Sequence, residues 1–179
     1  MKKFILLAGL TALSLAGIKE DFFHTGLSAK TLALGGTAFG FGVDSIYSNP
    51  AGLAVIPDEY YGYSYKTSFE NMVDTMTFEC MRPQGRGAWG LGLIHMNNGD
   101  ADKTEINEFD RPEVIGKFSE RQIGLSGAYA WPIWGDAAIG FGARYYRNDL
   151  DGEYGQALGF FCRVHQENKS SFIVRLVGE

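Results

Sequence analysis

The chain has no apolar run long enough for a transmembrane helix beyond its first residues. A helix that crosses a membrane needs about 18 or more consecutive apolar residues, and after position 17 no stretch of the 179-residue sequence approaches that length. Only helices and closed barrels satisfy all of their backbone groups in lipid. Any membrane role would therefore have to be carried by β-strands.

Cysteine and histidine are scarce, with two and three copies respectively. His24, His95 and His165 are widely spaced and have no cysteine or carboxylate at metal-ligand spacing, so we predict no metal site and no cofactor. Cys80 and Cys162 fall on strands that lie far apart in the predicted order. We interpret them as small apolar residues rather than as a disulfide.

Motifs of the common enzyme classes are also missing. The glycine-rich stretch 35–42 lacks the Gly-Lys-Ser/Thr ending of a phosphate-binding loop. Ser126 lies in the middle of a predicted strand, not on the strand-to-helix turn of a nucleophile elbow. We therefore predict that the protein is not an enzyme.

The first 17 residues have the three parts of a secretory signal peptide. Two lysines at positions 2 and 3 are followed by the apolar run 4–15 and then by small residues. The cysteine that a lipoprotein signal requires is absent at position 18. We predict that residues 1–17 are a cleaved signal peptide and that the mature protein is exported.

Positively charged residues are fewer than negatively charged ones. The chain has 16 lysines and arginines against 21 aspartates and glutamates, a net charge of −5. Without the two signal-peptide lysines the balance is 14 minus 21, or −7, for residues 18–179. A negative chain is poorly suited to a phosphate backbone, so we expect no nucleic-acid partner.

From residue 59 onward the sequence repeats one pattern. Segments of about ten residues alternate large apolar residues with small or polar ones and end at turn signals. The predicted strands are residues 59–66, 72–81, 87–96, 120–131, 136–147, 155–165 and 171–177. Four prolines fall between these strands, where a missing N–H group costs no ladder bond; they are Pro57, Pro83, Pro112 and Pro132.

The two faces of the predicted strands differ in composition. Successive side chains of a strand point to opposite faces, so one face carries large apolar residues such as Leu125 and Phe141. The other carries glycine, alanine and serine with single charges, which are Glu79, Glu120, Arg144, Arg163 and Arg175. A soluble sandwich would not expose so small a face to water. The pattern is typical of an outer-membrane β-barrel, whose large face meets lipid and whose small face lines the lumen.

The connections between the predicted strands largely alternate between short and long. Bacterial barrels have short periplasmic turns and longer extracellular loops. The longest connection is the acidic stretch 97–119. Taking the tight turns as periplasmic places residues 100–117 outside the cell, as a loop.

Two stretches carry a resemblance to a known family. Residues 28–54 contain a Gly-Gly run, an acidic residue with small neighbours and an Asn-Pro-Ala-Gly-Leu turn; these are Leu32, Ala33, Leu34, Gly35, Gly36, Thr37, Ala38, Asp44, Ser45, Asn49, Pro50, Ala51, Gly52 and Leu53. Residues 127–152 contain a Tyr-Ala-x-Pro-Ile turn between two alternating segments. Together they resemble the N-terminal signature and a hairpin of the FadL-like outer-membrane proteins, most closely the PorV/PorQ branch and its uncharacterised relatives.

The resemblance implies an all-β fold, an antiparallel up-and-down outer-membrane β-barrel with an N-terminal hatch. Residues 18–58 would form the hatch and residues 59–179 the strands. The hatch turn in the lumen would consist of Gly35, Gly36, Asp44, Asn49, Pro50, Ala51 and Gly52. From the residues alone, a surface turn leading into the first strand stays open.

The resemblance also implies a function in the outer membrane. The barrel would act in protein secretion as a shuttle or docking barrel, or in the passage of hydrophobic small molecules. Its partners would be outer-membrane lipid and either secretion-machinery proteins or a hydrophobic ligand, with no cofactor. Two other functions stay open: a soluble periplasmic β-sheet binding protein, and a small eight-stranded structural or adhesive barrel.

The odd strand count leaves the barrel incomplete, since single-chain bacterial barrels have even numbers of strands. Either a strand from residues 31–42 closes an eight-stranded barrel, or the sequence is the N-terminal half of a larger one. We favour the second, because an eight-stranded lumen has little room for a hatch.

Overall fold

The computed structural model describes residues 22–23, 29–33, 43–106, 110–134, 137–166 and 173–176. The predicted signal peptide and the glycines Gly35 and Gly36 lie outside these residues. So does most of the stretch 31–42, for which a closing strand was one alternative. Its first three residues belong to a short helix, α3 (Ala29–Ala33), not to a strand.

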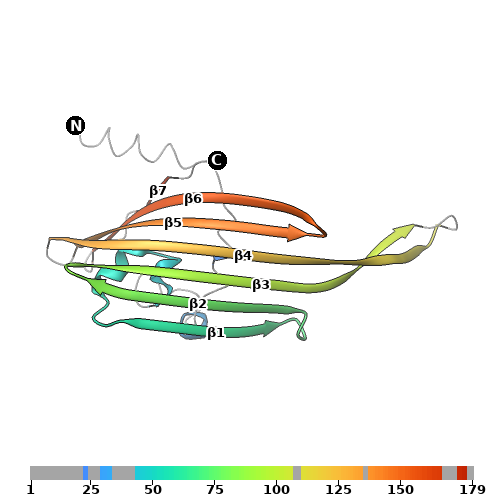
Figure 1. Ribbon diagram of the computed structural model, residues 1–179, viewed down its shortest axis with the longest axis horizontal. Helices are drawn as coiled ribbons and strands as arrows, with labels where there is room; N and C mark the ends of the chain where they lie inside the picture. Colours follow the sequence, from blue (N-terminus) through green and yellow to red (C-terminus); the bar gives the residue numbers. More distant parts are fainter. Residues whose placement is uncertain are drawn as a thin grey trace.

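Seven β-strands form one antiparallel sheet in which each strand pairs with the next in sequence (Figure 1). They are β1 (Tyr60–Ser68), β2 (Val73–Gln84), β3 (Gly87–Ile106), β4 (Pro112–Trp134), β5 (Ala137–Leu150), β6 (Glu153–Gln166) and β7 (Ile173–Leu176). The all-β class, the up-and-down order and the position of every predicted strand are confirmed. Because β1 and β7 do not pair with each other, the described sheet is open.

The described helices are all short. They include α3 and the two 3-10 helices η1 (Val43–Ile46) and η2 (Pro50–Val55). Within the described residues, no helix is long and apolar enough to cross a membrane. Figure 1 shows η1 and η2 against one side of the sheet, beside the middle strands. We call this side the inner face and the opposite side the outer face.

The predicted loop at residues 100–117 is wrong. Most of it is strand, because β3 and β4 continue as a two-stranded ribbon that projects beyond their neighbours (Figure 1). Register shifts at 97/100 and 103/104 interrupt the ribbon, and Gly99 takes a φ of +65° at the first. The sequence pattern missed it because a ribbon with water on both sides needs no apolar alternation.

The placement of three prolines between strands is also wrong. Pro112 is the first residue of β4, where a missing N–H group is tolerated. Pro132 lies within β4 at a register shift against β5. Pro83 lies within β2, beyond Met81, the last β2 residue that pairs with β1. Each proline therefore occupies a part of the ladder that tolerates a lost donor.

The burial of the sheet is inverted relative to that of a water-soluble protein. In β4 the residues from Arg121 to Ser126 alternate between exposed and buried, and the exposed ones include Ile123 and Leu125. The buried ones on this strand are Gln122, Gly124, Ser126, Ala128 and Ala130. One row across the outer face consists only of large residues, Tyr63, Phe78, Leu93, Leu125, Tyr145 and Leu158. The small residues of the inner face are thus covered, while large apolar residues of the outer face, such as Phe78, Leu125 and Leu158, are exposed.

Candidate functional site

The Asn-Pro-Ala-Gly turn forms the capped start of η2. Asn49 is the N-cap residue, and its Oδ1 accepts a hydrogen bond from the backbone N–H of Ala51 at 3.3 Å. Pro50 occupies the first turn, where its missing N–H group has no helical partner to lose. Residues Pro50 to Leu53 are buried. Asn49 therefore caps η2, and Pro50 begins it.

Residues 43–55, which we call the seated segment, lie in hollows that glycines leave in the inner face. A Cβ built on Gly140 would overlap the backbone of Pro50 and Ala51. A Cβ on Gly90 would stand 2.7 Å from the Ile46 side chain and 3.3 Å from that of Leu53. The glycines of β3 and β5 are therefore required for the close approach of the segment.

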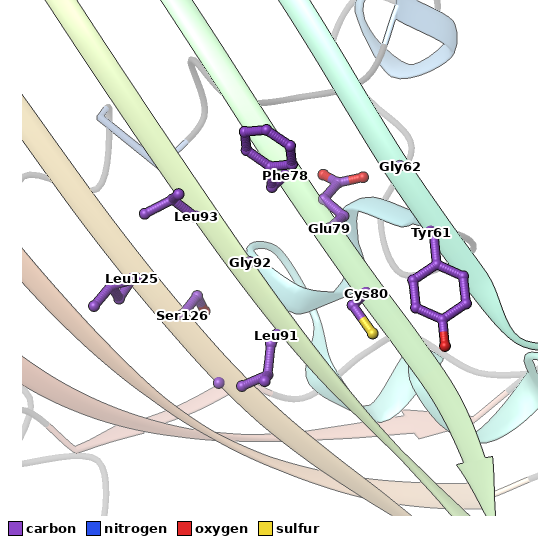
Figure 2. Close-up of a pocket in the computed structure, with 11 residues that line it drawn as sticks. Tyr61, Gly62, Phe78, Glu79, Cys80, Leu91, Gly92, Leu93, Leu125 and Ser126 are labelled. Carbon is purple, nitrogen blue, oxygen red and sulfur yellow. The ribbon is translucent and has the colours of Figure 1, made fainter.

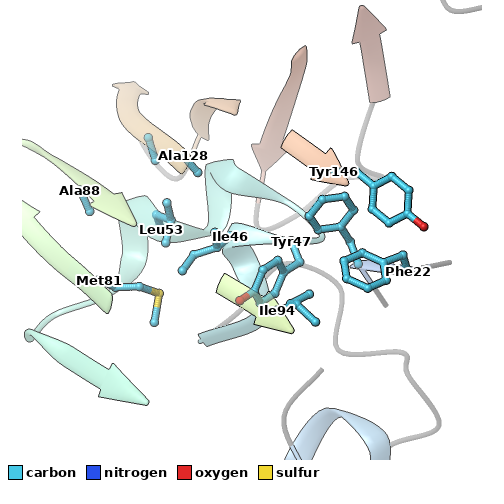
Figure 3. Close-up of a cluster of buried hydrophobic side chains, with 11 residues drawn as sticks. Phe22, Ile46, Tyr47, Leu53, Met81, Ala88, Ile94, Ala128 and Tyr146 are labelled. Carbon is cyan, nitrogen blue, oxygen red and sulfur yellow. The ribbon is translucent and has the colours of Figure 1, made fainter. Parts of the chain in front are cut away.

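Further hydrophobic side chains extend this contact along the inner face (Figure 3). A Cβ on Gly124 would overlap the ring of Phe22, whose centroid lies 5.0 Å from that of Tyr146. Phe23 packs edge-on against Phe22 with centroids 5.4 Å apart. Together with Ile46, Tyr47, Leu53, Met81 and Ile94 these residues form the buried core cluster of the described chain. The main hydrophobic core thus lies between the seated segment and the sheet.

A polar row crosses the inner face beneath the segment. The backbone register aligns Glu79 of β2, Gly92 of β3, Ser126 of β4 and Arg144 of β5. The Ser126 hydroxyl donates a hydrogen bond to the backbone oxygen of Ile46 at 3.1 Å. The Arg144 guanidinium donates to the next backbone oxygen, that of Tyr47. Ser126 and Arg144 therefore hold the end of η1 through two consecutive backbone carbonyl groups.

Arg144 is enclosed by aromatic rings. Its guanidinium carbon lies 4.9 Å from the centroid of Phe23 and 4.2 Å from that of Phe161. Such stacking is favourable for a guanidinium, and it is stronger when the cation is removed from water. With 5% of its surface exposed, Arg144 links the seated segment, β5 and β6.

The acidic end of the row lies at Glu79. Asp44 of η1 is 1% exposed and accepts a hydrogen bond from the Thr31 hydroxyl of α3. The Tyr47 hydroxyl, at 3.4 Å, donates to the backbone oxygen of Phe78. Burial raises the pKa of Tyr47, and the negative charges of Glu79 and Asp44 raise it further. Tyr47 therefore remains a neutral hydrogen-bond donor at physiological pH.

The structure brings together most of the predicted site residues that it describes; they are Asp44, Asn49, Pro50, Ala51, Gly52, Glu79 and Arg144. Glu120 instead joins a separate network, in which it accepts from Gln122 at 2.9 Å and from Asn98. Arg163 pairs with Gly140 in the register and so shares the inner face. For Arg175 only the backbone of β7 is described, opposite Phe161.

Sequence reasoning missed the residues that receive the segment. The strand pattern places Ser126, Gly90, Gly92 and Gly140 on the small-residue face of a lumen, but it does not identify them as the surface that receives the segment. The signal that could have identified them is their alignment. Once the strand order is assumed to be sequential, Gly92, Ser126 and Arg144 fall in one row, and Gly90 falls in the next.

The outer face carries an open apolar hollow of about 490 Å³. Figure 2 shows Phe78, Leu91, Leu93 and Leu125 around it. Its position follows from small residues on the outer face, since Cys80 and Gly127 lie on either side of Leu91 in the register. Cys80 and Cys162 are both free thiols in this structure. In the described part of the chain, no group of three or more histidine, cysteine or acidic side chains is arranged to hold a metal ion.

Comparison with known proteins identifies no relative. No protein-family model matches the chain, and no curated protein or solved structure shows a significant match.

Proposed function

We propose that this protein is an outer-membrane β-barrel protein of the FadL/PorV type, in which the sheet forms part of the barrel wall. In this proposal the outer face meets lipid, the inner face lines the lumen, and the seated segment is the hatch. The resemblance at residues 28–54 and 127–152 supports it. The observation that carries it is the inverted burial of the sheet.

The outer face carries exposed large hydrophobic side chains, so its contact with water is unfavourable. Tyr61 is 69% exposed, Leu91 57% and Phe141 52%. They belong to a face on which large residues are neighbours across consecutive strands, as in the row Tyr63, Phe78, Leu93, Leu125, Tyr145 and Leu158. Soluble monomers rarely expose contiguous apolar patches larger than a few hundred Å². Hydrocarbon favours the same surface, as on the lipid-facing side of a barrel.

A barrel wall also requires partners for both sheet edges. The backbone groups on the open side of β1 and of β7 would be unsatisfied in lipid, which has no hydrogen-bonding groups to offer. We propose that further strands, outside those described, meet these edges. The seven described strands are all antiparallel to their neighbours, so such strands would continue the same up-and-down order.

The packed inner face favours a docking or shuttle role in protein secretion. Ile46, Tyr47 and Leu53 are at most 2% exposed, and they cover the inner face over β3 and β4. A solute would have to displace the segment or pass elsewhere. A docking barrel needs no such path. Passage of a hydrophobic small molecule is the second form of the proposal, and it requires the segment to move.

Two native thiols provide a test in the intact cell. Cys80 and Cys162 are half-buried and belong to the outer face, where Cys162 pairs with Phe141 in the register. We expect the mature chain in the outer-membrane fraction. Both thiols should resist a membrane-impermeant maleimide until the membrane is dissolved and the protein is unfolded. Recovery of the chain in the periplasmic supernatant, with thiols that react at once, would favour the soluble binding protein instead.

A further inference from the structure

Glu79 is a buried acid that the packing of the segment leaves without a partner. It is 8% exposed, and its Oε1 atom is buried with no hydrogen-bond partner. Its neighbours in the register are Gly62 and Gly92, which have no side chain to offer. A buried carboxylate in this position loses its hydration without receiving hydrogen bonds in return.

The groups that face Glu79 make its negative charge still more costly. Asp44 of η1 interacts with it electrostatically and has the same sign. Tyr47 after η1 and Tyr60 of β1 also interact with Glu79, and both are neutral hydroxyl groups at physiological pH. The cation of the row, Arg144, is held at Tyr47 and between two aromatic rings. No described cation forms an ion pair with Glu79 in this structure.

We propose that Glu79 is a proton-operated latch for the seated segment. While the carboxyl group of Glu79 carries a proton, it adds no charge beneath η1, and the segment stays in its glycine-lined hollows. Loss of the proton places a second buried charge beside Asp44, and this loosens residues 43–55. The segment is therefore held more tightly at low pH and less tightly at high pH. A proton fits this pair better than a metal ion, which usually takes three or more protein ligands.

This inference deepens the proposed function, since it assigns a control to the proposed hatch. It rests on that function for its cellular setting. Its physical basis is the contact between the segment and the sheet, which exists wherever the protein resides. The experiment below therefore uses purified full-length protein, and its failure would leave the membrane assignment to be decided by fractionation.

The accessibility of residue 45 measures whether the seated segment is held against the sheet. Ser45 is 1% exposed and its hydroxyl has no hydrogen-bond partner, so Ser45→Cys is a mild change. In a C80A/C162A background, the rate of maleimide labelling at this position reports exposure of η1. Thiol reactivity itself rises with pH. At each pH the labelling rate of the protein with Glu79 is therefore divided by that of the same protein carrying E79Q. Glutamine has nearly the shape of a protonated glutamate and cannot ionise.

We expect this ratio to be near one at about pH 5 and to rise roughly tenfold by about pH 9. The matched control is E120Q, which removes an inner-face acid outside the latch and should leave the ratio unchanged. A ratio near one at every pH would overturn the latch. So would a fall in labelling on addition of calcium that E79Q abolishes, since the pair would then bind a metal ion.

Discussion

Gly140 lies directly against the backbone of Ala51, so close that a methyl group on Gly140 would overlap the Ala51 nitrogen. The two residues are 89 positions apart in the sequence. One lies in the Asn-Pro-Ala-Gly turn and the other in the fifth strand. The contact joins stretches 28–54 and 127–152, and it explains why position 140 needs a glycine.

Gly140→Ala tests this contact. Because the overlapping atoms belong to backbone rather than to a flexible side chain, the segment or the strand must shift. We expect a loss of about 1 to 3 kcal/mol in the free energy of unfolding, as for other overpacked cores. Denaturant titration of the original and variant proteins, in one medium in which both fold, measures this difference in the free energy of unfolding.

The matched control for this variant is Gly127→Ala. A Cβ at Gly127 would meet only the Leu91 side chain, at an ordinary 3.5 Å. Its stability should change little. Equal losses in the two variants would contradict the seating of Ala51 on Gly140.

Arg144→Lys tests the clamp on the seated segment. Lysine keeps the charge but lacks the planar fork that reaches the Tyr47 oxygen while stacked between Phe23 and Phe161. We expect a loss of about 1 to 3 kcal/mol, because a buried carbonyl group loses its donor. The same unfolding titration measures it.

Arg147→Lys serves as the control on the same strand. Arg147 is exposed, and its guanidinium carbon lies 5.1 Å from the Tyr154 ring centroid. This substitution should be nearly neutral. If Arg144→Lys proves equally neutral, Arg144 does not hold the segment.

The strands and their order could be predicted from the sequence because alternation has a fixed period of two. The composition of the two faces follows from the same rule. Residues Ile123 and Leu125 belong to one face whatever lies beyond it. Which face is covered could not be derived in this way, because it depends on a segment that packs from elsewhere in the chain.

The contacts of the candidate site could be predicted only in part. Asn49 and Pro50 act on their nearest neighbours, so local chemistry predicts their roles. The bond from Ser126 to the Ile46 oxygen spans 80 positions, and it depends on the register of several strands at once. The projecting ribbon of β3 and β4 was missed for a different reason, since it lacks the apolar face on which the strand prediction relied.

Substitutions at two adjacent residues test which face of the sheet meets lipid. Leu125 is 47% exposed on the outer face, whereas Ser126 is 3% exposed beneath Ile46. In lipid vesicles Leu125→Arg should cost about 2 to 4 kcal/mol if it lies near the midplane. In water such a surface change would cost less than about 0.5 kcal/mol. Refolding yield and stability in vesicles measure the difference.

Ser126→Arg should act in another way. Its side chain lies under the seated segment, where the hydroxyl donates to the backbone oxygen of Ile46. The larger residue should expel the segment, so a thiol placed at Ser45 becomes reactive at every pH. An unchanged labelling rate would show that Ser126 does not lie beneath the segment.

The contact between the outer face and lipid is measured most directly by the native tryptophans. The chain has three, at positions 89, 131 and 134, and Trp131 and Trp134 are 46% and 74% exposed. In vesicles of lipids brominated along their acyl chains, an outer face in contact with lipid predicts strong quenching of tryptophan fluorescence by the bromine atoms. Fluorescence equal to that in unbrominated vesicles, from protein that is folded and bound to the vesicles, would contradict the account.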